Sequence, residues 1–562
     1  MQAKVSAVLI LVVIIAAACA APAAQPPAAQ PAATSAPVEV TRIVAGTPQV
    51  VIVTSQPQPT AVAQATAAPN ESPTPAPVKG GKLVVAVPGD PGLWDPKFGS
   101  DNNALWAMAQ IYANLLKVSK DGKSVEPWLA ESYEVSSDLK TATFHLHKNA
   151  KFCDGSPITA NDVKFSFERY LEPDSGVSWQ YSAGTKVNVV DDYTVQVISG
   201  SPSVWFTQAL ILWGTDIMSE KYVKGLSKDE IAAKPLGSGP FCLESWDKGN
   251  GYVLKPNPGY WDTPAWVDEV DVRVVRDDNS RVLQLESGDV DIAVNIPANQ
   301  VEVLNKYPGV KGYANKLWGL AAIALNEKTV PAFKDKKVRQ AMSYAIDRQA
   351  LVNTVLFGQG EVAKSPFYGS DISYYTPDFA HNYDLEKAKQ LMAESSFPNG
   401  FTADLTVVAG DTLGTETAVI LKDMLSKIGI TVNITPVEQG SWFSNWSSYN
   451  YQMLYKLGAN DVVDPGENIP FDFLQIEDGG QGAAFTGWSN PEVTKLAHAG
   501  LIEQDPEKRR QIYYDLQRIV MDETPQIVLF HPYSHWGQRD NVHGFEIAQT
   551  SMYKLWEVWK TQ

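Results

Sequence analysis

The residues that can build a packed core are confined to one part of this chain. All 16 Trp, 22 Tyr and 19 Phe residues lie beyond residue 79, although the chain has 562 residues. Residues 20–79 contain no aromatic residue and are dominated by Pro and Ala. Such a segment buries too little apolar surface to offset the entropy of ordering it. The folded protein must therefore be formed by Gly80–Gln562.

The first 18 residues have the pattern of a bacterial signal peptide. A short start with Lys4 precedes the uncharged, mostly apolar run Val5–Ala18, which is shorter than the roughly 20 residues that cross a bilayer. Three alanines then precede Cys19, which resembles the lipobox of bacterial lipoproteins. We therefore expect residues 1–18 to be a lipoprotein signal peptide and Cys19 to carry the lipid. The position three before the cysteine is Ala16 instead of the usual bulky aliphatic residue, so an ordinary cleaved signal is the alternative.

Residues 19–79 are expected to be the lipidated cysteine followed by a disordered, Ala/Pro-rich tether. Proline-rich sequence favours an extended chain without a core. The β-branched run Val50–Val53 is typical of a strand, but no partner for it is evident in the sequence. We therefore assign this run to the tether as well.

Charge and cysteine content exclude several classes of function. The formal net charge of −17 argues against nucleic acid and against anionic lipid, because both are bound by clustered Lys and Arg. The sequence has no Cys-x-x-Cys, His-Glu-x-x-His or EF-hand pattern, so we expect no metal and no cofactor. Cys153 and Cys242 are the only thiols besides Cys19. In an extracytoplasmic compartment they could form a disulfide, but the sequence does not give their separation.

Strand and helix patterns alternate along the folded part. Lys82–Val87 is typical of a buried strand, and Thr143–His147 alternates with period two. The segments Val270–Val274, Asn279–Ser287 and Val290–Val294 predict a strand, a helix and a strand, which is a βαβ unit. Capping patterns predict further helix starts at Thr159, Asp335, Asp384 and Asp505. The fold class is therefore mixed α/β.

Several segments in fixed order resemble one protein family. They are Thr143–Arg169, Gly237–Phe241, Asn257–Trp261, Leu285–Asp291, Lys337–Arg348 and Ala388–Leu391. Together they are similar to the dipeptide/oligopeptide-type, family 5 solute-binding proteins of ABC importers, and the likeness runs from about Gly80 to the C-terminus.

The resemblance implies a two-lobe periplasmic-binding-protein clamshell of the class II type, with an extra α/β subdomain inserted in the first lobe. Hinges are expected near Trp318–Ala324 and Pro525–Phe530. The expected divisions are lobe I from residues 80–126, 236–320 and 528–562, the inserted subdomain from 127–235, and lobe II from 321–527.

The resemblance also implies where a solute binds. In Asp461-Val-Val-Asp464-Pro465 the first acid corresponds to the one that takes a peptide's α-ammonium group, while Asp464 is expected to serve the turn. The early loop implies that Lys97, Phe98 and Gly99 pair with the ligand backbone. Five tryptophans are further candidates for the cleft wall, with core packing as the alternative: Trp94, Trp318, Trp442, Trp446 and Trp488.

The expected function is a non-catalytic, extracytoplasmic receptor of an ABC importer. It would capture di- or oligopeptides between its lobes, act as a monomer at the membrane through its lipid anchor, and deliver solute to the permease and ATPase complex. The Trp content leaves an oligosaccharide or glycoside as the alternative ligand. An extracellular hydrolase is a remote alternative, because no catalytic pair or triad can be assembled from the sequence. A sensor that docks to a signalling receptor is not distinguished from a transport receptor.

Overall fold

The computed structural model describes residues 38–44, 47–53, 76–98, 102–119, 122–204, 210, 214–480 and 482–561. The described residues fall into two units, a smaller one with residues 38–43 and 48–53 and a larger one with residues 44, 47 and those from 76 onward. Cys19 and the signal peptide lie outside the described residues.

The N-terminal segment contains a pair of strands, β1 (Val38–Val44) and β2 (Thr47–Val53). They form a two-stranded sheet. The expectation that Val50–Val53 belongs to a disordered tether is therefore wrong. The sequence Val-Glu-Val-Thr-Arg-Ile-Val of β1 alternates β-branched and polar residues, and it supplies the partner that was not recognised.

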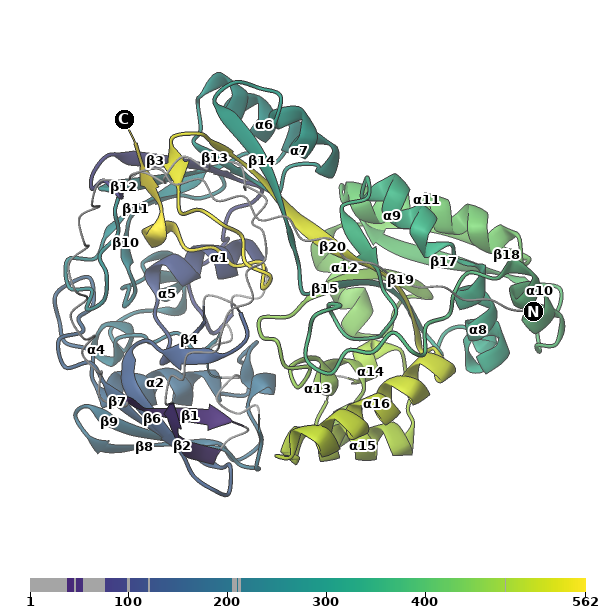
Figure 1. The fold of residues 1–562 in the computed structure, drawn as a ribbon, viewed down its shortest axis with the longest axis horizontal. Coiled ribbons are helices and arrows are strands. Elements are labelled where there is room, and N and C mark those ends of the chain that lie inside the picture. The colour runs from purple at the N-terminus through teal and green to yellow at the C-terminus, as the bar shows by residue number, and fades with distance from the viewer. Residues whose placement is uncertain are drawn as a thin grey trace, which may run out of the picture. The chain divides into compact units, whose positions relative to one another are not determined.

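The larger unit is built on a sheet of twelve strands (Figure 1). Along the sheet the order is β10-β11-β12-β3-β13-β20-β15-β19-β17-β18, and β14 and β16 also pair with β20. The strands are β3 (Lys82–Val87), β10 (Phe241–Asp247), β11 (Gly251–Pro256), β12 (Glu269–Val274), β13 (Ile292–Val294), β14 (Val310–Lys316), β15 (Gly319–Leu325), β16 (Gly360–Val362), β17 (Phe401–Val408), β18 (Ile430–Val437), β19 (Met453–Ala459) and β20 (Gln526–Arg539).

Three smaller sheets accompany it. One pairs β4 (Leu116–Val118) with β5 (Val125–Pro127), and another pairs β21 (Val542–His543) with β22 (Trp559–Lys560). The third has the order β6-β7-β9-β8, from β6 (Ala130–Val135), β7 (Thr141–Leu146), β8 (Lys186–Asp191) and β9 (Thr194–Ile198).

The helices fall before, between and after these strands. Those in the first half are α1 (Asn102–Ile111), α2 (Ala160–Tyr170), α4 (Glu220–Val223), α5 (Lys228–Ala233), α6 (Asp278–Ser287) and α7 (Ala298–Leu304). Those in the second half are α8 (Lys336–Ala345), α9 (Arg348–Val355), α10 (Leu385–Ala393), α11 (Thr412–Ser426), α12 (Gln439–Ser447), α13 (Asn468–Asp472), α14 (Gly482–Phe485), α15 (Pro491–Ile502) and α16 (Pro506–Glu523). Among the described residues, none of these helices is long and apolar enough to cross a bilayer.

The predicted βαβ unit is confirmed, and β3 lies between its two strands in the sheet. β12 and β13 each pair in parallel with β3, and α6 connects them. The carboxylate of Asp277 accepts from the N–H of Ser280 and caps the start of α6. Gly288 ends the helix in the left-handed conformation, with φ of 86°, which glycine adopts without a steric penalty.

The sheet β6-β7-β9-β8 has a core of its own. Along β7, Ala142, Phe144 and Leu146 are buried in alternation, and they pack with Phe167 of α2 in one hydrophobic cluster. The capping box predicted at the start of α2 is present, since the N–H of Thr159 donates to the Asp162 carboxylate at 2.9 Å.

The possible disulfide is present. Cys153, which follows β7, is bonded to Cys242 of β10, and their Cα atoms lie 5.8 Å apart. The bond therefore connects the loop beyond the small sheet to the edge strand of the large one.

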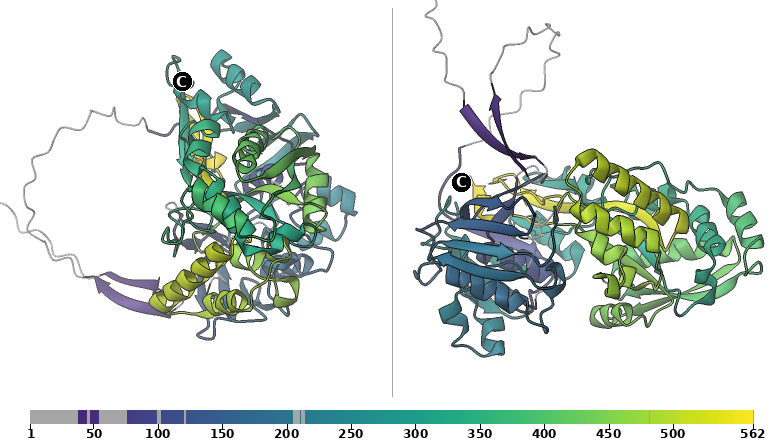
Figure 2. Two further views of the ribbon diagram at one scale, coloured as in Figure 1. Left: turned by 90° about the vertical axis from the view of Figure 1, so that its right-hand side faces the viewer. Right: turned by 90° about the horizontal axis from the view of Figure 1, so that it is seen from below.

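The described second half of the chain contains further cores, of which two are built on long helices. One packs α8, α10 and α11 against β17 and β18, and the predicted caps Asp335 and Asp384 start α8 and α10. The other contains α15 and α16, which lie side by side (Figure 2) and pack against the segment around Phe367 and Tyr368. α16 begins at its predicted cap, Asp505, with Pro506 in the first turn.

β20 is shared by both halves of the large sheet. Its C-terminal part pairs with β13 and β14, and its N-terminal part pairs with β15 (Figure 1). The β15–β20 register is broken between Ala321 and Ala322. A break of this kind bends and twists a strand locally.

Candidate functional site

The candidate site is a cavity of about 570 Å³ that is lined by both acidic and aromatic residues. One side of it is formed by α1, and another by α12, β19 and the segment that leads into α13. Its lining includes Trp442, Trp446, Lys456, Asp461, Glu467 and Asn468. Sequence positions more than 300 residues apart therefore meet at one site.

Two carboxylates lie together in this wall. The backbone N–H groups of Asp461 and Val462 donate to Glu467 Oε2 at 2.9 and 3.2 Å. Burial raises the pKa of Asp461 to about 7. Burial, and then the neighbouring Asp461, raise the pKa of Glu467 well above its usual range. The pair is therefore costly to ionise fully unless a cation approaches it.

The basic groups around this pair are engaged elsewhere. Lys456 Nζ lies 2.6 Å from Asp472 Oδ1. Arg509 Nη2 donates to Asp464 Oδ1 at 2.8 Å, and Nη1 contacts the other oxygen of the same carboxylate. Among the described residues, Asp461 and Glu467 form no ion pair with Lys, Arg or His.

Asp464 has the turn role that the sequence predicts. Its Oδ1 accepts from the N–H of Gly466 at 2.8 Å. The ion pair with Arg509 adds a second structural role.

Two of the residues that line the cavity each carry a buried polar atom without a partner among the described residues. Asn468 is 5 % exposed, and its Oδ1 accepts no hydrogen bond. Trp442 Nε1 is also buried and donates none. Buried polar atoms are normally satisfied, so these two are exceptions among the residues that line the cavity.

The aromatic part of the wall is fixed by a ring contact and by a hydrogen bond to the backbone. The Trp446 ring lies 5.1 Å from the Trp442 ring, between centroids. Trp446 Nε1 donates to the carbonyl of Ala484 at 2.9 Å. The cavity therefore combines a flat apolar wall with a set of acceptors suited to an ammonium group.

The other candidate tryptophans do not line this cavity. Trp94 is fully buried, and its ring lies edge-on to Trp246 and Tyr252. Trp318 is 1 % exposed, and its Nε1 donates to Asp371 Oδ1 at 3.1 Å. Trp488 belongs to the core around α15 and α16.

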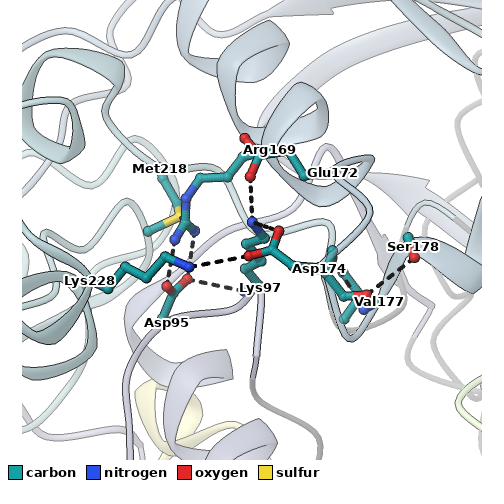
Figure 3. Close-up of polar contacts among 10 residues, drawn as sticks. Asp95, Lys97, Arg169, Glu172, Asp174, Val177, Ser178, Met218 and Lys228 are labelled. Carbon is teal, nitrogen blue, oxygen red and sulfur yellow. Dashed lines mark hydrogen bonds and ion pairs between the residues drawn. The ribbon is translucent and has the colours of Figure 1, made fainter.

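Lys97 does not line this cavity, and its buried side chain belongs to an ionic network whose acidic partners Glu172 and Asp174 are exposed (Figure 3). Its ammonium group pairs with Glu172 and lies 2.5 Å from Asp174. Its backbone N–H donates to Asp95 Oδ1 at 3.1 Å, and its carbonyl accepts from the N–H of Gly176, also at 3.1 Å. Both backbone groups are therefore engaged within the protein.

The neighbouring members of that loop lie beside this network. Asp95 pairs with Arg169, as Figure 3 shows. Phe98 is half-buried, and its N–H donates to the carbonyl of Asp95 at 3.0 Å. Gly99 lies outside the described residues.

Glu467 and Asn468 were missed in the sequence. They come two and three residues after the Asp-x-x-Asp-Pro segment. An acid so close to a proposed ammonium contact is the signal that could have identified Glu467.

Comparison with known proteins assigns this architecture to a family. Residues 124–474 match the bacterial extracellular solute-binding proteins, family 5, in its middle region. The probable D,D-dipeptide-binding periplasmic protein DdpA of Escherichia coli K12 is 30% identical over 473 residues, which are 82% of this chain and 91% of DdpA.

Two solved structures have the same fold. DppA of Helicobacter pylori in complex with the peptide STSA has a TM-score of 0.78 and 27% identity, and the match covers 86% of this chain and 99% of DppA. AgaA of A. tumefaciens R10 in complex with agropinic acid has a TM-score of 0.77 and 26% identity, over 86% of this chain and 99% of AgaA. The predicted two-lobed fold is thereby confirmed.

These relatives are binding proteins, which removes the hydrolase alternative. The family resemblance seen in the sequence is confirmed over most of the folded part. This chain belongs to the family 5 bacterial extracellular solute-binding proteins.

Proposed function

We propose that this chain is the receptor of an ABC importer and that it captures peptides by their N-terminal ammonium group. The observation that carries this proposal is the pair Asp461 and Glu467, which face the cavity with no cation beside them among the described residues. A peptide ammonium would supply the missing positive charge, and the carboxylates would fix its direction.

The remaining wall suits the rest of a peptide. The Asn468 carbonyl oxygen is free to accept an N–H, and Trp442 and Trp446 offer apolar surface for a side chain. The relatives named above support this ligand class, since DppA is bound to a peptide and DdpA is named for dipeptides.

A sugar-containing solute is the second candidate. The observation that favours it is the pair of adjacent indole rings, because flat aromatic surfaces also pack against sugar faces. AgaA, in complex with agropinic acid, supports ligands other than peptides within the same fold.

The proposal includes the setting of the receptor. Cys19 would carry the lipid that holds the monomer at the membrane, and the permease and ATPase complex would receive the solute. Lobe I, the inserted subdomain and lobe II keep the boundaries given above. The two halves would hinge where β15 and β20 join them, because both strands belong to the connected sheet.

Ligand class is tested by a thermal-shift screen of residues 76–562 against di- to pentapeptides and against oligosaccharides. A solute that binds only the folded state raises the melting temperature. We expect peptides with a free N-terminus to raise it and N-acetylated versions of the same peptides to have no effect. Stabilisation by oligosaccharides but by no peptide would overturn the peptide proposal.

The ammonium contact is tested by titration calorimetry of Asp461→Asn with a peptide found in that screen. The amide keeps the shape of the side chain but removes its charge, so we expect affinity to fall at least about tenfold. Asp540→Asn is the matched control, because Asp540 is exposed and does not line the cavity. Equal affinities of the two variants would exclude Asp461 as the contact.

A further inference from the structure

A second, smaller cavity adjoins the first. Its volume is about 130 Å³, and it shares Leu105, Asp461 and Met552 with the larger cavity. Most of its wall is apolar, from Leu105, Met108, Leu116, Val118, Trp128 and Met552. A group bound at Asp461 therefore lies at the entrance to an apolar space.

Asp216 is a second carboxylate in the wall of this smaller cavity. It is 7 % exposed, and burial raises its pKa to about 7. Its charge is stabilised by the backbone N–H groups of Gly214 and of Asp216 itself. Its own carbonyl accepts from the Tyr170 hydroxyl at 2.5 Å, so the turn that holds it is fixed from behind.

No cation faces Asp216 among the described residues. Lys117 also lines the cavity, but its Nζ lies 3.5 Å from Asp262 Oδ2 at the exposed side. Arg169 is engaged with Asp95 at 2.5 Å. Residues 205–213 precede Asp216 closely in the chain and contain no charged residue.

The dimensions of the cavity limit what it admits. At roughly 30 Å³ per water molecule, a cavity of 130 Å³ has the volume of about four waters. A short alkyl chain with one polar end has a similar volume. Apolar walls favour the chain, and a buried carboxylate at the wall favours a cationic end. A neutral apolar side chain would leave the Asp216 carboxylate without a partner of opposite charge, which is unfavourable for its ionised form.

We propose that Asp216 is a specificity-determining residue, which receives the cationic end of the ligand's first side chain while Asp461 binds its α-ammonium group. The substrate class is then peptides whose N-terminal residue carries an alkyl ammonium group, such as lysine or ornithine. This inference rests on the proposed function, since it places the N-terminus of a peptide at Asp461.

The test is calorimetry of wild type and Asp216→Asn with two tripeptides, Lys-Ala-Ala and norleucyl-Ala-Ala. Norleucine has a linear alkyl side chain without the ammonium group. We expect wild type to bind the lysyl peptide at least about tenfold more tightly. We expect Asp216→Asn to lose that preference while its affinity for the norleucyl peptide stays unchanged or rises.

The controls separate this inference from the proposed function. Asp262→Asn changes the exposed partner of Lys117 and should keep the preference for lysine. Equal binding of the two peptides by wild type, or an intact preference in Asp216→Asn, would overturn the role of Asp216 and leave peptide binding standing. If oligosaccharides stabilise wild type while neither these two peptides nor any peptide of the screen does, the proposed function fails and this inference fails with it.

Discussion

Asp216 makes stability depend on pH in a direction opposite to that of an ion-paired acid. Its folded-state pKa of about 7 lies above the ordinary value of 3.8. Between these values the folded protein holds a proton that the unfolded chain has lost, so the free energy of unfolding falls as pH rises. The neighbouring Tyr112, Tyr170 and Tyr181 have pKa values raised above 10 by burial and stay neutral in this range.

The first prediction follows from this difference. Denaturant unfolding of the ligand-free proteins at pH 5, 6, 7 and 8 measures this. As pH rises, the free energy of unfolding of wild type should fall relative to that of Asp216→Asn, by an amount on the order of a few kcal/mol. Asp461 shares the cavity and contributes in the same direction in both proteins. Parallel stability curves for wild type and variant would contradict the raised pKa of Asp216 in the folded protein.

The buried carboxylate of Asp464 differs from that of Asp216, because it forms an ion pair with Arg509. Arg509→Met should lower the free energy of unfolding by about 3–5 kcal/mol, since it leaves the Asp464 carboxylate buried without its partner. Arg510→Met is a control one residue along α16, where the pair with Glu507 is exposed and should contribute less than about 1 kcal/mol. Similar urea midpoints for the two variants would show that the buried pair does not stabilise the fold.

At the scale of elements, the disulfide ties a loop to an edge strand. Cys153 and Cys242 are 89 residues apart in the sequence, so the bond restricts a long loop of the unfolded chain. The double variant Cys153→Ser with Cys242→Ser should lose about 2–4 kcal/mol of stability.

The measurement is urea unfolding with and without dithiothreitol. Reductant should lower the midpoint of wild type to that of the double variant and should leave the variant unchanged. A wild-type midpoint that does not respond to complete reduction would contradict the stabilising role of the bond.

Elements with local signals were predictable from the sequence. The caps Asp335, Asp384 and Asp505 start helices because a side-chain oxygen satisfies N–H groups in the first turn. These signals act within three or four residues and need no tertiary context. β1 was missed because its alternation becomes a strand only when β2 pairs with it.

The candidate site was predictable only in part. Asp461, Trp442 and Trp446 are brought to one cavity, but Trp94 and Trp488 lie in cores. An aromatic side chain can pack in a core or line a cleft equally well, so sequence spacing alone does not distinguish core tryptophans from cleft tryptophans. Asp216 carries no local signal, because its environment comes from α1, β4 and the distant segment at Asp461.

At the scale of the whole molecule, the proposed attachment to the membrane depends on one residue, Cys19. The apolar run before Cys19 is too short to span a bilayer. In cells, the full chain should therefore sediment with membranes, and Cys19→Ser should move to the soluble extracytoplasmic fraction. Immunoblots of fractionated cells measure this. A Cys19→Ser protein that stays with the membrane would show that another part of the chain holds it there.

β20 also imposes an order on folding. The strand ends at Arg539, yet it is the neighbour of β13, β14, β15 and β16. Neither half of the large sheet is complete until this strand arrives, more than 400 residues after β3. A chain emerging from its N-terminus therefore stays open at the centre of its main sheet through most of synthesis. Completion of the main sheet is thereby postponed until the last part of the chain has been made, while the sheet β6-β7-β9-β8 has a core that does not include β20.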